Sequence, residues 1–432
     1  MSEIEQRTMS KVAWRLVPFL MFCYFIAYLD RVNLGFAGGP MSKDLGFSSS
    51  VFGGAAGIFF IAYFFFEVPS NMALDKFGAR LWIARIMFSW GLIAGAEAFV
   101  QGAKSLYAVR LLLGVAEAGF FPGFIFFITR WFPAAYRARI VGLFMFAIPI
   151  STVIGAPISG ALLNLDGWNG LKGWQWMFVI EAVPALIMSV VVYFYLTDRP
   201  SNAHWLADDE RKWLRDRLAA EVATRERDGA ASWLHSMLDG RVIALGFVYM
   251  GCNIPQYGLS FFLPQIVKAF GLTNVQAGFV TALPYAVGAI GMILWSRNSD
   301  ATQERKWHAI IPLLIISAGL LAAANVADPT IKMAFLCVAG FGFFSVLPVF
   351  WTLPTSFLSA GGAAAGIAAV NSIGNLGGYF GPQIFGYLKD VSGEFASLVY
   401  LAVCALIGAV IVFALGHDPA LERPTEGVRA AE

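Results

Sequence analysis

Apolar stretches long enough to cross a membrane recur along almost the whole chain. About 20 consecutive apolar residues span a bilayer as a helix, and twelve such stretches fit between residues 12 and 416. Only 13% of the 432 residues are charged, which is about half the share of a soluble protein. So little charge could not cover the surface of a water-soluble protein of this size. The sequence therefore predicts an all-α membrane protein with about twelve transmembrane helices.

The predicted spans form two groups of six on either side of a polar stretch. The first group is expected at 12–36, 50–73, 82–102, 105–129, 139–163 and 175–197. The second group is expected at 241–268, 275–297, 308–326, 331–355, 362–388 and 395–416. The domains that follow are an N-terminal bundle at 1–197, a cytoplasmic linker at 198–240, a C-terminal bundle at 241–416 and a cytoplasmic tail at 417–432.

The two groups carry matching residues at one constant offset. Each of four positions in the first group recurs 225 residues later in the second: Asp75 as Asp300, Arg80 as Arg305, Trp82 as Trp307 and Pro157 as Pro382. The halves are therefore predicted to be parallel copies, and two parallel repeats with a binding site between them form a transporter architecture.

The distribution of positive residues predicts the orientation. Arginines cluster in the segments on one face, whereas each loop on the other face holds a single lysine. Lysine and arginine mark cytoplasmic loops. Both termini are thus expected in the cytoplasm of a bacterial cell, with the chain passing many times through the inner membrane.

Composition argues against several other classes. The cations are scattered, so no nucleic-acid partner is expected. The four cysteines lie within apolar segments and the four histidines at segment ends or in polar stretches, so no metal or other cofactor is predicted. No nucleophile–base pair is evident, and the chain is predicted not to be an enzyme.

Several motifs together resemble the major facilitator superfamily, and within it the anion:cation symporter branch. They are Tyr28-Leu-Asp30-Arg31-Val-Asn33, the stretch from Arg110 through Glu117 to Gly119, Trp174-Gln-Trp176 before Glu181, Phe350-Trp351-Thr352-Leu-Pro354 and the stretch from Asn371 to Gly378. The likeness is closest to bacterial permeases for tartrate, phthalate and hydroxyphenylacetate. It implies two pseudo-symmetric six-helix bundles, proton-coupled uptake of a carboxylate, and a functional monomer.

Charges inside the predicted spans all belong to the first half. They are Asp30, Arg31, Glu67, Glu97, Arg110, Glu117 and Glu181. A charged side chain at the bilayer centre costs at least about 2.5–3.5 kcal/mol, so each one indicates a function or a buried partner. The first half is expected to handle protons and ionic attraction, and the second to supply neutral polar and aromatic contacts.

Arg31 is the candidate substrate-binding cation. A guanidinium stays charged and matches the shape of a carboxylate. Its counterpart 225 positions later is Gln256, which can still form hydrogen bonds. The alternative is a structural pair with Asp30 or another buried acid. Neutral residues expected around the same cavity are Tyr28, Tyr63, Tyr257, Trp351, Asn371 and Asn375; packing or membrane-interface anchoring is the alternative for the aromatic ones.

Asp30 and Glu117 are the candidate proton carriers, because burial raises a carboxyl pKa and a nearby arginine lowers it. The resemblance implies the same role for acids in helices one and four. Arg110 shares a helical face with Glu117 and is expected to pair with it, or else to attract the anion as a second cation. A static ion pair is the alternative for each acid.

Asp75, Arg80, Asp300 and Arg305 are expected to form a cytoplasmic latch between the halves. The predicted function is symport of a small organic anion with protons, driven by the proton gradient. Drug efflux by proton antiport is the alternative, because Gly155-Ala-Pro157 faintly resembles a helix-five motif of antiporters. The sequence leaves the particular carboxylate, the proton stoichiometry, the physiological direction and the oligomeric state open.

Overall fold

The computed structural model describes residues 2–227, 237–353 and 360–415, and its regular elements are all helices. Strands are absent from these described ranges, as an all-α membrane protein requires. The predicted tail at 417–432 and Pro354 of the Phe350–Pro354 motif lie outside the described residues.

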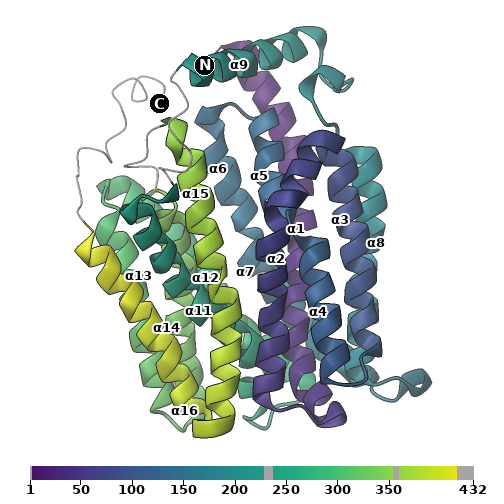
Figure 1. The fold of residues 1–432 in the computed structure, drawn as a ribbon, viewed down its shortest axis with the longest axis vertical. Coiled ribbons are helices and arrows are strands. Elements are labelled where there is room, and N and C mark those ends of the chain that lie inside the picture. The colour runs from purple at the N-terminus through teal and green to yellow at the C-terminus, as the bar shows by residue number, and fades with distance from the viewer. Residues whose placement is uncertain (1, 228–236, 354–359, 416–432) are drawn as a thin grey trace.

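The first half consists of eight α-helices that lie together on one side of the molecule (Figure 1). They are α1 (Glu3–Leu45), α2 (Ser49–Phe77), α3 (Ala79–Ala96), α4 (Ala103–Glu117), α5 (Phe120–Trp131), α6 (Ala134–Met145), α7 (Ala147–Leu162) and α8 (Gly173–Tyr195). The predicted fourth span is α4 followed by α5, and the fifth is α6 followed by α7. Within this half, α3 packs on α8, α2 on α4 and α1 on α7.

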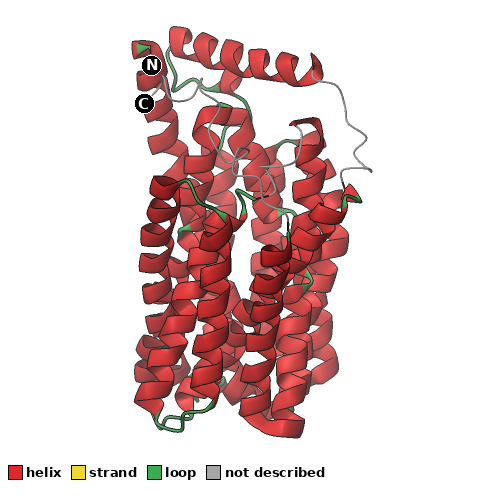
Figure 2. Cartoon of the chain, turned by 90° about the vertical axis from the view of Figure 1, so that its left-hand side faces the viewer, coloured by secondary structure: helices red, strands yellow, loops and turns green. Residues whose placement is uncertain are grey.

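The second half lies beside the first (Figure 1), and Figure 2 shows that the described elements are helices joined by loops. Its helices are α11 (Gly240–Lys268), α12 (Asn274–Thr302), α13 (Lys306–Ala324), α14 (Pro329–Phe350), α15 (Ala360–Asn375) and α16 (Gly377–Ala414). The main packing pairs are α11 with α16, α13 with α14 and α12 with α14.

The described residues contain eleven helical stretches that are long and apolar enough to cross a membrane. The last of them, Gly366–Ala414, has 49 residues, which is about twice the length that a bilayer needs. Gly393 interrupts it with a φ of 84°, so the stretch makes two passes. The prediction of about twelve spans is confirmed.

Contacts between the halves concentrate at one end of the molecule. They join α1 to α11, α2 to α16 and α7 to α12. Near this end the Ser49 N–H and the Ser50 N–H donate to the Asp390 carboxylate at 3.0 and 2.6 Å. Here a Cβ on Gly53 would overlap the carbonyl of Pro382, and this close approach of two backbones requires glycine. The N-terminus and α9 (Asp208–Arg227) lie at the opposite end (Figure 1).

Helix α9 forms part of the predicted linker and is attached to the first half. The Glu210 side chain is fully covered and accepts hydrogen bonds from Arg7 at 2.8 Å and Lys11 at 2.7 Å, both on α1. Farther along α9, Glu221 accepts from the Ala134 N–H at 3.0 Å and pairs with Arg137 at 3.0 Å. The linker helix therefore lies across the end of the first bundle.

One predicted span contains a break that matters for the site. The span predicted at 105–129 lies within the apolar stretch Ala103–Trp131, but α4 ends at Glu117 and α5 begins at Phe120. Between them Gly119 adopts a φ of 85°, which favours glycine. A Cβ there would also overlap the hydroxyl of Ser70. The break places Glu117 at the last turn of α4.

Candidate functional site

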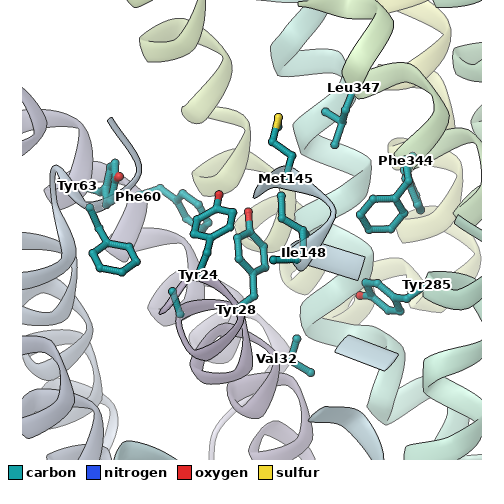
Figure 3. Packing of buried hydrophobic residues seen from close by; sticks show 14 of the residues in the cluster. Tyr24, Tyr28, Val32, Phe60, Tyr63, Met145, Ile148, Tyr285, Phe344 and Leu347 are labelled. Atoms are coloured by element: carbon teal, nitrogen blue, oxygen red, sulfur yellow. The ribbon is translucent and has the colours of Figure 1, made fainter. Parts of the chain in front are cut away.

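A cavity of about 50 Å³ lies between the two halves. Figure 3 shows the side chains around it from close by, with Tyr24, Tyr28 and Tyr63 on one side and Leu347 on the other. The lining residues are Tyr24, Tyr28, Arg31, Phe59, Phe60, Tyr63, Phe121, Met145, Ile148, Tyr249, Asn253, Gln256, Tyr257, Leu347, Asn371 and Asn375.

Arg31 is the only charged residue among these lining residues of the described chain. It projects from α1, and its Nη2 pairs with Oε1 of Glu117. The guanidinium lies over the ring of Tyr28, with its carbon 4.8 Å from the ring centroid. Its Nε is buried and forms no hydrogen bond within the described structure. Arg31 thus combines a cation, an aromatic support and unused donor capacity at the cavity wall.

Glu117 is the partner of Arg31, and its side chain is only 2% exposed. The expected pairing of Glu117 with Arg110 is wrong. Arg110 instead pairs with Glu97 at 3.3 Å and donates to the carbonyls of Ala55 and Ala56 at 3.3 and 3.4 Å. Arg110 and Glu117 lie on α4 seven positions apart, as the prediction of a shared face required. However, neighbouring elements supply a different partner to each. Arg110 is buried behind α2 and does not line the cavity.

Asp30 lies on the same helix as Arg31, but it is not among the residues that line the cavity. It is 5% exposed, and neither carboxylate oxygen has a hydrogen-bond partner in the described structure. The acids that act on it electrostatically, Glu181, Glu117 and Glu97, all belong to the first half. Asp30 is therefore a buried acid inside the first bundle, behind the cavity wall.

Most of the predicted neutral residues do line the cavity: Tyr28, Tyr63, Gln256, Tyr257, Asn371 and Asn375. Trp351 does not. Its ring packs edge-on against Tyr249 with the centroids 4.9 Å apart, so the expectation that Trp351 lines the cavity is wrong. Asn371 also links the halves, since its amide donates to Oε1 of Glu67 at 3.2 Å.

Sequence reasoning missed three polar lining residues, namely Tyr24, Tyr249 and Asn253. The internal repeat identifies these three residues. Tyr24, Tyr28 and Arg31 are spaced i, i+4 and i+7 on α1, and they recur 225 positions later as Tyr249, Asn253 and Gln256 on α11. Residues with this spacing share one helix face. The repeat thus presents equivalent faces of α1 and α11 to the cavity from opposite sides.

The four residues of the predicted latch form ion pairs within their own halves. Arg130 pairs with Asp75 at 2.6 Å, and Arg305 pairs with Asp300 at 2.7 Å. The Arg80 N–H donates to Asp198 at 2.7 Å. None of these pairs in the described structure crosses between the halves, so a latch between them stays a prediction for another conformation.

Two parallel helical bundles around a central polar cavity, in a chain with many apolar spans, define the class of a multi-pass membrane transporter. The sequence pattern of the Major Facilitator Superfamily matches residues 20–382. The chain belongs to that superfamily, and it is a transporter of a small molecule rather than an enzyme.

Relatives and solved structures agree with this assignment. A protein of Agrobacterium vitis named "Putative tartrate transporter" is 51% identical over 411 residues, covering 95% of each chain. The "Quinolone resistance transporter" of Acinetobacter baumannii is 40% identical over 413 residues, again covering 95% of each. A crystal structure of a bacterial homologue of the human lysosomal transporter Spinster matches with a TM-score of 0.75 at 17% identity, covering 94% of this chain and 96% of that one. The last likeness concerns the fold alone.

Proposed function

We propose that this protein takes up a small organic anion, a carboxylate, together with protons. The observation that carries the proposal is the Arg31–Glu117 pair at the wall of a central cavity in which Arg31 is the only charged lining residue of the described chain. A lone guanidinium in a tyrosine- and amide-lined cavity attracts a carboxylate and disfavours a cation. The relative of Agrobacterium vitis, named for tartrate, supports a hydroxy-dicarboxylate as substrate.

Coupling follows from competition for Arg31. A substrate carboxylate that binds the guanidinium displaces Glu117, which is then a buried acid without a counter-ion. An unpaired charge of this kind is costly, so Glu117 takes up a proton. Asp30, buried without hydrogen-bond partners, is the second acid that can carry one. Protons neutralise the charge of the anion, which otherwise would work against about 2.3 kcal/mol per charge per 100 mV.

The substrate reaches the cavity by alternating access. With both termini in the cytoplasm, the end at which α2 meets α16 faces the periplasm, and the present conformation is closed on that side. Rocking of the halves around the cavity then opens one side at a time. The latch residues Asp75, Arg80, Asp300 and Arg305 would act in the conformation closed toward the cytoplasm. The proton gradient is the driving force, with no other cofactor, and the monomer is the working unit.

The test is uptake into proteoliposomes of radiolabelled tartrate, phthalate, a sugar acid and phenylacetate, with an inward proton gradient imposed or collapsed. One acid is expected to accumulate only with the gradient. Glu117→Gln should abolish accumulation but keep exchange of labelled for unlabelled acid, because exchange needs no net proton movement. Arg31→Gln should abolish both. A matched control is Lys212→Gln, which removes an exposed charge from α9, far from the cavity.

A second candidate is efflux of a drug or metabolite by proton antiport. The likeness to a quinolone resistance transporter favours it. Expulsion of a fluoroquinolone by the same vesicles, with no carboxylate accumulated, would establish efflux and overturn the uptake proposal.

A further inference from the structure

A second, basic pocket lies far from the central cavity, where α9 crosses the end of the first bundle. It has a volume of about 500 Å³ and lies between the α5–α6 connection, the short 3₁₀ helix Pro200–Asn202 and α9. Its charged lining residues are Arg130, Arg137, Arg199, Arg215 and Glu221. Four arginines against one lining glutamate give this pocket a strong positive potential.

Two of the four arginines form ion pairs that hold the wall of the pocket together. Arg130 pairs with Asp75 at 2.6 Å. Arg137 donates to the carbonyl of Phe132 at 2.7 Å and pairs with Glu221 at 3.0 Å. These contacts fix the α5–α6 connection to α9 and hold the wall in place. They neutralise two of the four arginines.

The other two arginines keep their charge available. Arg199 is exposed just before the 3₁₀ helix. Its backbone carbonyl accepts from the Asn202 N–H, but its side chain forms no hydrogen bond or ion pair within the described residues. Arg215 lies on α9, and its closest acid, Asp216, is its own exposed neighbour at 3.4 Å. An exposed pair of adjacent residues contributes little. Two guanidinium groups therefore remain to bind an anion from opposite sides of the pocket.

The position of the pocket indicates the chemistry of the anion. The apolar stretches Ala103–Trp131 and Ala134–Leu165 end and begin at its wall, so the pocket lies at the level of the lipid headgroups. Guanidinium groups bind phosphate in a bidentate manner, and basic pockets at the ends of membrane helices bind anionic headgroups. We propose that this pocket binds a phosphate group with net negative charge, carried by an anionic glycerophospholipid headgroup or by a small soluble phosphate ester. The inference does not depend on what the central cavity transports.

The experiment measures thermal unfolding of the purified full-length protein in a neutral detergent. Short-chain phosphatidylglycerol, short-chain phosphatidylcholine and glycerol 1-phosphate are titrated separately. Phosphatidylglycerol is expected to raise the melting temperature, with half-maximal effect at roughly fivefold higher concentration in Arg199→Gln and in Arg215→Gln and about 30-fold higher in the double variant. Lys212→Gln, which removes a charge from α9 outside the pocket, should behave as the unaltered protein.

The outcomes separate the two sources of phosphate. Stabilisation by phosphatidylglycerol alone, lost in the arginine variants, identifies a lipid headgroup. The same arginine dependence with glycerol 1-phosphate identifies a soluble ester. Equal stabilisation by phosphatidylcholine and phosphatidylglycerol, or a response that is unchanged in both single variants, overturns the proposal. Both arginines are exposed, so each single variant should have the melting temperature of the unaltered protein when no ligand is present. If the double variant fails to fold, the two single variants alone test the proposal.

Discussion

Two buried arginine–glutamate pairs lie in the first half, and exposure distinguishes their roles. Both side chains of the Arg110–Glu97 pair are 2% exposed, whereas the Arg31 side chain is 15% exposed and meets the cavity. Arg110 also donates to two backbone carbonyls of α2, so it fastens α2 to α4. A pair with no access to solvent cannot exchange partners with a substrate. Arg31–Glu117 can do so, and Arg110–Glu97 is a structural pair.

Arg110→Gln is expected to destabilise the folded protein by about 3–5 kcal/mol, because it leaves Glu97 buried without a counter-ion. The double change Arg110→Met with Glu97→Leu should recover most of that loss, since replacing a buried pair with apolar residues is often close to neutral. Thermal unfolding in detergent measures both. If Arg110→Gln melts normally and loses only substrate affinity, Arg110 attracts the anion instead.

At the scale of elements, α9 behaves as an attachment of the first bundle, and Glu210 is its anchor. Burial raises the pKa of the Glu210 carboxyl, but the hydrogen bonds from Lys11, the Ala207 N–H and Arg7 outweigh burial, and the net pKa lies below the ordinary value of 4.5. A carboxyl whose pKa is lower in the docked state stabilises docking above its ordinary pKa. That stabilisation is lost as the pH falls through the lowered value.

Docking of α9 is therefore expected to hold at neutral pH and to weaken only below about pH 4.5. Hydrogen exchange of the α9 amides should stay slow from pH 7 to pH 5, after correction for the intrinsic rate. Glu210→Gln should speed this exchange already at pH 7, whereas Asp216→Asn, an exposed acid on the same helix, should not. Equal protection in the Glu210→Gln protein would contradict the anchoring role.

The helices also show which structural features the sequence predicts and which depend on packing. Hydropathy is a local property, and it predicted the spans. Matching residues at one constant offset predicted the repeat, and the polar residues within the spans, together with the family resemblance, predicted most lining residues. The break at Gly119 was missed because glycine is common inside membrane helices. The close approach of Ser70, which a Cβ at this position would overlap, comes from a neighbouring helix and is not visible in the sequence. The prediction that Glu117 pairs with Arg110 was wrong for a similar reason. Spacing identifies which residues share a face, but only the packing of helices decides which face they meet.

For the whole molecule, the conformation depends on contacts between the halves at one end. Asp390 receives hydrogen bonds from Ser49 and from both the N–H and the hydroxyl of Ser50, all from the other half. A hydrogen bond to a charged group contributes about 1.5–3 kcal/mol. This group of bonds is thus comparable to the few kcal/mol that separate two populated conformations.

Asp390→Ala is expected to shift the population toward opening at this end by about 10-fold or more. Spin labels on α2 and α16, with distances measured by pulsed electron paramagnetic resonance, would show a growing long-distance component. Glu394→Ala is the matched control, because Glu394 pairs at 2.8 Å with Lys332 inside the second half. An identical distance distribution in Asp390→Ala and Glu394→Ala would show that these bonds do not hold the end closed.

The cavity receives its one charged lining residue among the described residues, Arg31, from the first half and its amides, Asn253, Gln256, Asn371 and Asn375, from the second. In the proposed symport, the acids that carry protons and the amides that contact the substrate are thus encoded by different portions of the same gene. A lineage that alters the amides would then change its substrate and keep the proposed proton coupling. Chimeras that exchange only the second halves between relatives should accordingly take their substrate preference from one parent and their proton coupling from the other.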